Sequence, residues 1–301
     1  MGTPSYATRI LEALCHETDI NVVLLVTQED KPVGRKQILT PPDTKAWLLS
    51  QNLSVEIYQP KILRDEVVQA KIAFYRPDFI VVAAYGKILP KAILDIAPCI
   101  NLHASLLPKY RGASPIQSTL LANEVYAGVT SMLMEEGLDT GAILGFSYLK
   151  VKPEDHSEIL FESLALQAAR LSILTLNHFD NIAPWKQIDA DATHCAKIRK
   201  EDGEISFSLS VHEIMTHYKA FTPWPGLFLP SGLKLIHIKV YEAYTRYEHS
   251  GVIIAFVNEG VVITCKQGSL LIQSVQPASK KPMSILDYIR GKRLIIGDTL
   301  V

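Results

Sequence analysis

Apolar residues in the first half of the chain alternate between short continuous runs and longer stretches with helical spacing. The continuous runs at residues 21–27, 79–84 and 99–103 are typical of strands buried on both faces, and a shorter run covers 55–58. Helical spacing predicts helices at about 4–16, 44–51 and 65–75. Strands and helices that alternate in this way predict an α/β fold with a mostly parallel sheet.

The pattern changes after a long helix that we predict at about 156–177. Residues 181–204 are mostly polar and are typical of a linker. A helix at 211–221 then precedes four β-rich runs, at 235–240, 251–256, 261–265 and 270–273, with turn residues between them. This spacing predicts a small β-barrel. We therefore expect a larger domain at 1–180, a linker at 181–204 and a smaller C-terminal domain at 205–301.

Composition adds limits to this picture. The chain has 301 residues, 48% of them hydrophobic, and a net charge of −1, which argues against nucleic-acid binding by bulk charge but permits a local basic patch. We find no apolar stretch of the ~20 residues that a membrane helix needs, and no secretory signal. The four cysteines are scattered, so we expect reduced thiols, a cytoplasmic protein and no metal site.

Candidate chemistry gathers at the end of the strand predicted at 99–103. Asn101 and His103 are two residues apart, so their side chains share one face of the strand. An amide can donate to a developing oxyanion, and an imidazole suits proton transfer near neutral pH. Asp139 lies between Gly137 and Gly141, where a tight turn is expected. If the fold unites the three, they suit acyl transfer by direct attack of an amine.

Other readings of these residues have less support. The sequence Asp-Thr-Gly at 139–141 also matches the signature of aspartic proteases, but those enzymes need two such carboxylates and this chain has one. Neither G-x-G-x-x-G nor G-x-x-x-x-G-K-[ST] occurs, so nicotinamide and ATP sites are not indicated.

Several motifs together resemble the methionyl-tRNA formyltransferase family, a branch of the folate-dependent formyltransferases. They are Asn-x-His-x-Ser-Leu-Leu-Pro-x-x-Arg-Gly at 101–112, Ala-Ser-Pro-Ile-Gln at 113–117, Gly-Leu-Asp-Thr-Gly at 137–141, Ala-Phe-Thr-Pro-Trp-Pro-Gly at 220–226 and Gln-Pro-Ala-Ser-Lys-Lys-Pro-Met at 276–283. The Asn, His and Asp core is shared by the whole superfamily, whereas the full set is specific. The resemblance covers nearly the whole chain.

The resemblance implies a Rossmann-like catalytic domain and a C-terminal domain similar to the OB fold. It implies transfer of a formyl group from 10-formyltetrahydrofolate to methionyl-initiator tRNA by a cytoplasmic enzyme without a metal, which we expect to be a monomer. The implied catalytic residues are Asn101, His103 and Asp139. The implied folate-binding residues are Tyr85, Gly86, Ser105, Leu106, Leu107 and Pro108. The implied RNA-binding residues are Lys31, Arg35, Lys36, Lys280 and Lys281.

Two alternatives share this core. One is a formyltransferase acting on an amino-sugar nucleotide, and the other is a non-catalytic RNA-binding relative. The sequences Pro-Ile-Gln at 115–117 and Gly-Leu-Asp-Thr-Gly at 137–141 favour tRNA as the substrate. An intact trio argues against loss of catalysis, whereas the missing first strand, described next, argues slightly for it.

The start of the chain departs from the family pattern. In the family, Gly-Thr-Pro follows an apolar strand at the centre of the sheet, whereas here Gly2 follows Met1 directly. We expect either a translation start upstream of Met1 or a sheet without its central strand, which would leave backbone groups of two neighbouring strands without partners.

Overall fold

The computed structural model describes all residues except 35, 52 and 301, and its contacts divide the chain into two compact units. The first unit comprises Met1–Thr119, Val125–Lys152 and Ile159–Ala196, and the second comprises Leu120–Glu124, Pro153–Glu158 and Lys197–Val301.

The sheet of the first unit is in two parts. β1 (Leu24–Val26) pairs with β4 (Glu56–Tyr58) in parallel. The other part has the order β5-β6-β8-β9, formed by β5 (Ile80–Val82), β6 (Cys99–His103), β8 (Tyr126–Leu133) and β9 (Ile143–Lys150). β5 and β6 are parallel, whereas β8 and β9 join antiparallel. The predicted α/β fold is confirmed, and the two antiparallel strands are an addition to it.

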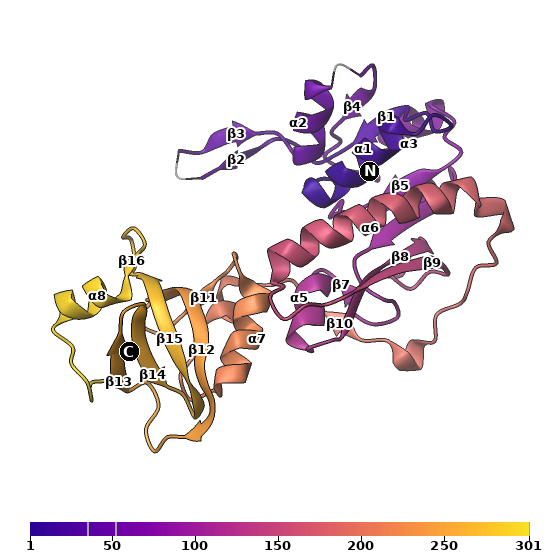
Figure 1. The fold of residues 1–301 in the computed structure, drawn as a ribbon. Helices are drawn as coiled ribbons and strands as arrows, with labels where there is room; N and C mark the ends of the chain where they lie inside the picture. The colour runs from indigo at the N-terminus through magenta and orange to yellow at the C-terminus, as the bar shows by residue number, and fades with distance from the viewer. Residues whose placement is uncertain (35, 52, 301) are drawn as a thin grey trace. The chain divides into compact units, whose positions relative to one another are not determined.

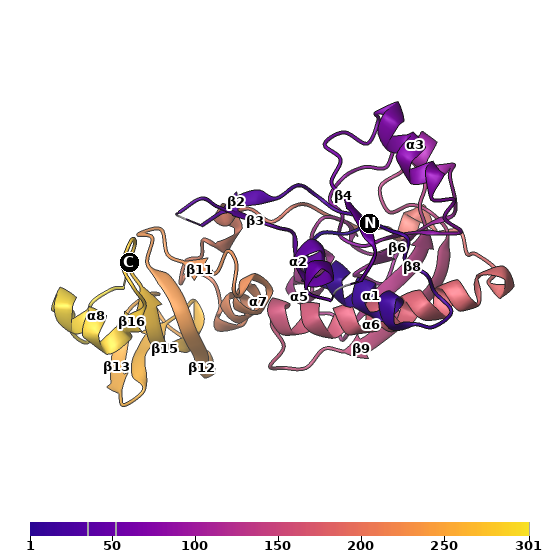
Figure 2. The same ribbon diagram turned by 90° about the horizontal axis from the view of Figure 1, so that it is seen from above.

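Helices cover both faces of this sheet. They are α1 (Ser5–His16), α2 (Asp43–Ser50), α3 (Glu66–Phe74), α4 (Lys91–Leu94), α5 (Pro115–Leu121) and α6 (Ser157–Asn177), with short 3-10 turns at Phe179–Asn181 and Asp189–Asp191. α1 and α6 lie together on one face and α3 lies on the other (Figure 2). Helices predicted at 4–16, 44–51, 65–75 and 156–177 are confirmed within one or two residues.

Successive residues of β1 show why a buried strand is apolar throughout. Leu25 packs with Leu11 and Leu48 of α1 and α2. Val26, its neighbour, packs on the other side in a cluster that includes Val68 of α3. Because side chains alternate across a strand, both faces of β1 are core.

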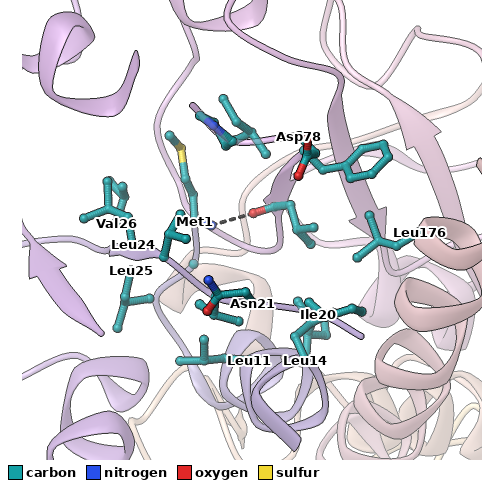
Figure 3. Close-up of a pocket in the computed structure, with 18 of the residues that line it drawn as sticks. Met1, Leu11, Leu14, Ile20, Asn21, Leu24, Leu25, Val26, Asp78 and Leu176 are labelled. Atoms are coloured by element: carbon teal, nitrogen blue, oxygen red, sulfur yellow. Dashed lines mark hydrogen bonds between the residues drawn. The ribbon is translucent and has the colours of Figure 1, made fainter. Parts of the chain in front are cut away.

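Residues of β1 and of β5 line a groove between these two strands, which do not pair with each other (Figure 3). It has a volume of about 460 Å³, and its lining includes Leu24, Val26 and Ile80. The first residues of the chain bridge it at one end. The Gly2 N–H donates to the Val26 carbonyl (3.1 Å), and the Met1 carbonyl accepts from the N–H of Ala83 (2.9 Å). The expected gap at the centre of the sheet is therefore present in this chain.

α6 is long and apolar enough to span a membrane by length and composition alone, with a mean hydropathy of 1.5 over its best window. In the structure it is a core helix. Leu160, Leu164, Ala165 and Ala168 are fully buried, and Phe161 contacts the ring of Tyr6 on α1. Its apolar face covers the sheet.

The polar segment between β1 and α2 contains a two-stranded ribbon. β2 (Lys31–Val33) pairs antiparallel with β3 (Ile38–Thr40), and every residue of both strands is exposed. The ribbon extends away from the body of the first unit (Figure 1). At its base, Asp30 accepts from Lys45 (2.8 Å) and Gln59 (2.8 Å).

The second unit is built on an antiparallel sheet with the order β11-β12-β15-β14-β13, to which β16 adds beside β15. Its elements are η3 (Lys200–Gly203), α7 (Val211–Phe221), β11 (Leu227–Phe228), β12 (Lys234–Arg246), β13 (Ile253–Val257), β14 (Gly260–Thr264), β15 (Gln267–Gln276), β16 (Met283–Ser284) and α8 (Ile285–Lys292). α7 begins with a capping box between Ser210 and Glu213. The predicted helix and four β-rich runs are confirmed, and each of the four overlaps a strand of this sheet.

Candidate active site

β6 carries two of the three candidate residues to the carboxyl end of its strand. Asn101 pairs with Val82 of β5 and Met132 of β8, and His103 pairs with Thr130 of β8. With neighbours on both sides, β6 is held rigidly, so its two side chains have fixed directions. His103 is buried and Asn101 is partly buried.

Asp139 comes from the turn between β8 and β9 and meets both residues. Its φ of +55° is in the left-handed region, where Asp and Asn are better tolerated than most residues. Oδ1 accepts from the Asn101 amide (3.4 Å), and Oδ2 lies 3.6 Å from His103 Nδ1. The Gly112 N–H also donates to Oδ2 (2.8 Å). The fold thus brings the predicted trio together.

His103 faces acceptors on two sides. Nε2 lies 2.9 Å from the carbonyl oxygen of Tyr110, and a carbonyl can only accept, so this nitrogen carries a proton. Nδ1 faces the Asp139 carboxylate. The two partners lie on opposite sides of the ring and fix its orientation.

The segment 110–112 holds this arrangement and was not assigned a role from sequence. Its β7 (Arg111–Gly112) pairs in parallel with β10 (His194–Cys195). The Tyr110 N–H donates to Thr193 Oγ1 (2.8 Å). Residues 182–195, which were predicted as part of a linker, therefore pack within the first unit. No local pattern signals this, since the pairing joins residues about 80 positions apart.

The predicted folate residues follow the trio along the chain but differ in exposure. Ser105 is buried, and its hydroxyl donates to the Lys109 carbonyl (2.6 Å). Leu107 packs in a core cluster with Met132 and Ile143, while Leu106 and Pro108 are partly exposed. Because Ser105 and Leu107 face the interior, Leu106 and Pro108 are the members of this set that a ligand can reach.

The other predicted folate segment has a buried ring. Tyr85 is 2% exposed and lies in the core cluster around Val26, where burial raises its pKa to about 12. Its carbonyl accepts from Gln28 Nε2 (2.7 Å). Gly86 has a φ of +75°, a backbone conformation that favours glycine because residues with a Cβ rarely adopt it. The side chain of Tyr85 therefore packs in the core, and the backbone of 85–86 is the part near the sheet edge.

The predicted RNA-binding residues lie on exposed loops of each unit. Lys31 and Lys36 are exposed on the β2–β3 ribbon, and Arg35 lies outside the described residues. Lys280 and Lys281 are exposed in the turn between β15 and β16. Lys280 and Lys292 line a hollow of about 460 Å³ that also contains Tyr288. The Lys292 ammonium lies 6.0 Å from the centre of the Tyr288 ring, so this hollow combines an aromatic ring with cations.

Within the described part of the chain, no group of three His, Cys, Asp or Glu side chains could hold a metal ion.

An amide, an imidazole and a turn carboxylate meet at a strand end of an open α/β sheet, an arrangement that can stabilise an oxyanion and move a proton. Comparison with known families agrees. Residues 1–176 match the model of the formyl transferase family, and residues 197–293 match that of the formyl transferase C-terminal domain. The chain belongs to the formyl transferase family.

Relatives match along the full length. The chain is 52% identical over 299 residues to the methionyl-tRNA formyltransferase of a Nitratiruptor species, covering 99% of this chain and 98% of that protein. It is 51% identical over 302 residues to the methionyl-tRNA formyltransferase of Campylobacter lari, covering 100% and 98%. The predicted family resemblance is confirmed.

Solved structures share the fold at low identity. An N-formyltransferase from Helicobacter canadensis, in complex with folinic acid and dTDP-3-aminofucose, matches with a TM-score of 0.65 at 18% identity, over 90% of this chain and 97% of that one. HypX from Aquifex aeolicus in complex with tetrahydrofolic acid matches with a TM-score of 0.61 at 14% identity, over 89% of this chain and 46% of that one.

Proposed function

We propose that this protein transfers the formyl group of 10-formyltetrahydrofolate to the amino group of methionyl-initiator tRNA. The relatives that carry the name methionyl-tRNA formyltransferase share half of its residues over its whole length. The observation that carries the proposal is the meeting of Asn101, His103 and Asp139, since this is the chemistry that formyl transfer to an amine requires.

In the proposed reaction, the amine nitrogen of the methionyl group attacks the formyl carbon, and a new C–N bond forms. The formyl oxygen then carries negative charge. The Asn101 amide has two hydrogens; one points to Asp139, and the other donates to the oxyanion. The protonated ring of His103, held by Asp139, stabilises the same charge.

The tetrahedral carbon then collapses, and the bond between the formyl carbon and the folate nitrogen N10 breaks. One proton leaves the attacking amine and one is gained by N10, so the products are formylmethionyl-tRNA and tetrahydrofolate. Asp139 accepts the amine proton through water, and His103 keeps the carboxylate in place. Both groups lie at the edge of the sheet, beside Leu106 and Pro108, which we assign to the folate.

We assign the tRNA to the basic loops. Lys31, Arg35 and Lys36 on the ribbon are proposed to contact the acceptor end, and Lys280 and Lys281 the RNA backbone. Lys31 and Lys36 are exposed on the ribbon, and exposed Lys280 lines a hollow that contains Tyr288, which supports this assignment. Because charged initiator tRNA is used where translation begins, we also propose a cytoplasmic location, and a monomer.

The proposal is tested by measuring formyl transfer from 10-formyltetrahydrofolate to three acceptors. These are charged initiator tRNA, charged elongator tRNA and an amino-sugar nucleotide. Efficient transfer to initiator tRNA alone is the expected result. Transfer to the amino-sugar nucleotide alone would identify the alternative enzyme, and binding of tRNA without any transfer would identify a non-catalytic relative.

A further inference from the structure

A buried glutamine in the predicted linker bonds to the turn that carries Asp139. Gln187 Nε2 donates to the carbonyl of Asp139 (2.8 Å) and to the carbonyl of Gly141 (2.8 Å). Both hydrogens of its amide are therefore used, one on each side of Thr140. Gln187 is 6% exposed, so these bonds are shielded from water.

The same glutamine accepts from a buried arginine. Arg111 Nε (3.0 Å) and one terminal nitrogen (2.9 Å) both donate to Gln187 Oε1. Two donors on the oxygen and two acceptors on the nitrogen fix the orientation of the amide without ambiguity. Arg111 is 4% exposed, and its other side-chain partner is Asp189 (2.9 Å), whose side chain is 81% exposed.

This bridge joins the two backbone segments that hold the catalytic pair. The carbonyl of Tyr110 accepts from His103, and the N–H of Gly112 donates to Asp139. Arg111 lies between these two residues. Through Arg111, Gln187 ties the segment 110–112 to the turn 139–141, and so it sets the position of the carboxylate relative to the imidazole.

The chain reaches this position by an antiparallel pairing. Trp185 and Ile143 exchange two backbone hydrogen bonds (2.8 and 2.9 Å). The segment that follows Trp185 therefore runs back along the segment that precedes Ile143, and Gln187 arrives opposite Gly141. Gly141 has no room for a side chain, since a Cβ would lie 1.8 Å from the Leu133 carbonyl oxygen. The turn is thus fixed from both sides.

We propose that Gln187 is a positioning residue for formyl transfer, which holds the Asp139 turn in register with His103 through Arg111. The inference rests on the proposed function, because it assigns Gln187 a role in that reaction. Gln187 contacts neither reacting group. It acts on the distance between residues that do, and small misplacements of reacting groups reduce rates steeply.

The variant Gln187→Glu tests this role while keeping the buried arginine paired. A glutamate still accepts from Arg111, but it has no N–H to donate to the carbonyls of 139 and 141. We expect kcat to fall by about 10- to 100-fold, with unchanged KM for folate and for tRNA. A purely structural role would lower the melting temperature and leave the kcat of the folded fraction unchanged.

Two further variants complete the test. Arg111→Lys keeps the positive charge but loses the paired donors, and an intermediate loss of kcat is expected. Asp189→Asn removes only the exposed partner of Arg111, and kcat should stay close to wild type because exposed ion pairs contribute little.

Each outcome decides the question. Wild-type kcat in folded Gln187→Glu, or a raised KM at unchanged kcat, overturns the proposal. If Gln187→Glu does not fold, Arg111→Lys decides in the same way, and failure of both to fold assigns the bridge a structural role only. A wild-type enzyme that does not formylate methionyl-tRNA would instead reject the proposed function.

Discussion

At the scale of single residues, the site depends on the partners that orient the imidazole of His103. His103 has the Tyr110 carbonyl on one side and the Asp139 carboxylate on the other. These two partners hold the imidazole in one orientation at the end of β6. Asn101 completes the set with a second donor on the same strand face.

Removing either donor should reduce turnover and spare binding. Loss of one oxyanion-hole donor typically costs about 100- to 1,000-fold in rate, so we expect a loss of this size in kcat for Asn101→Ala and for His103→Ala. Affinity for the folate, measured by titration calorimetry, should remain close to wild type. Unchanged turnover in either variant would refute the assignment.

Asp139 combines a chemical role with a backbone role, and two substitutions separate them. Asn tolerates the left-handed φ of +55°, so Asp139→Asn should fold as stably as wild type and lose turnover, because the carboxylate is gone. Ala at the same φ adds backbone strain of roughly 1–2 kcal/mol. Asp139→Ala should therefore lose turnover and also melt at a lower temperature. Equal melting temperatures for the two variants would count against strain at this position.

At the scale of elements, hydrophobic pattern was sufficient for strands buried on both faces and for helices with a clear apolar side. β6 and α6 are examples, since the spacing of their buried apolar residues is visible in the sequence. β8 and β9 were not predicted. They follow the motif-rich segment and pair antiparallel, outside the alternation of strands and helices on which the prediction of a parallel sheet rested. The ribbon of β2 and β3 was missed because all its residues are exposed, so no burial pattern marks it.

The catalytic candidates could be predicted from the sequence, whereas the residue that positions them could not. Asn101, His103 and Asp139 carry chemistry that can be recognised from residue type and spacing. Gln187 does not, because it lies in a polar stretch and its role arises from the distant pairing of Trp185 with Ile143. Residues that act through backbone carbonyls leave no local pattern in the sequence.

The ribbon should contribute to tRNA use and not to folate use. Lys31→Ala, Arg35→Ala and Lys36→Ala are each expected to raise the KM for charged tRNA without changing the KM for folate, because each variant removes a cation that would bind a phosphate. The dependence of log KM on log salt should weaken by about one unit of slope for every such cation removed. Lys91→Ala is the charge-matched control, since Lys91 is exposed on α4 and pairs with Asp95. An equal rise in both KM values would reject a role in tRNA binding.

At the scale of the whole molecule, the split sheet makes the first unit sensitive to pH. In protein made with Met1 as its first residue, the terminal amine is buried beside Val81, and burial lowers its pKa from 8.0 to about 5. In the unfolded chain the group keeps its ordinary pKa, so between pH 5 and 8 the unfolded state binds more protons. Above pH 8 the amine is neutral in both states and does not lower the free energy of unfolding. As the pH falls from 8 toward 5, the unfolded state gains a proton that the folded state does not bind, so the free energy of unfolding decreases.

Comparison with an Nα-acetylated chain isolates this contribution, because all other groups titrate alike in both proteins. We expect the acetylated chain to gain melting temperature relative to the free amine at pH 5.5, and to gain less at pH 8.5. A difference between the two chains that does not vary with pH would show that the amine is not buried in a site that disfavours its charged form.

The groove between β1 and β5 also predicts how the molecule responds to an added strand. Met1 and Gly2 already bond to Val26 and Ala83, so residues joined ahead of Met1 would continue between the two edges. Burying an Ile or Val side chain there stabilises the folded state by about 1.5–3 kcal/mol. Ordering the backbone costs about 1–2 kcal/mol of conformational entropy per residue, so each apolar residue gives a small net gain.

A net gain of a few kcal/mol would raise the melting temperature by about 5–10 °C in a chain of this size. We expect this rise for a five-residue extension of alternating Ile and Val, measured by calorimetry. An extension of the same length made of Gly and Ser is the control; it also removes the free amine from the groove, but it has no side chains to fill it. If both extensions change the melting temperature equally, only the amine matters and the groove does not accept a strand. If the apolar extension alone stabilises the protein, the two halves of the sheet are joined through the groove that now separates them.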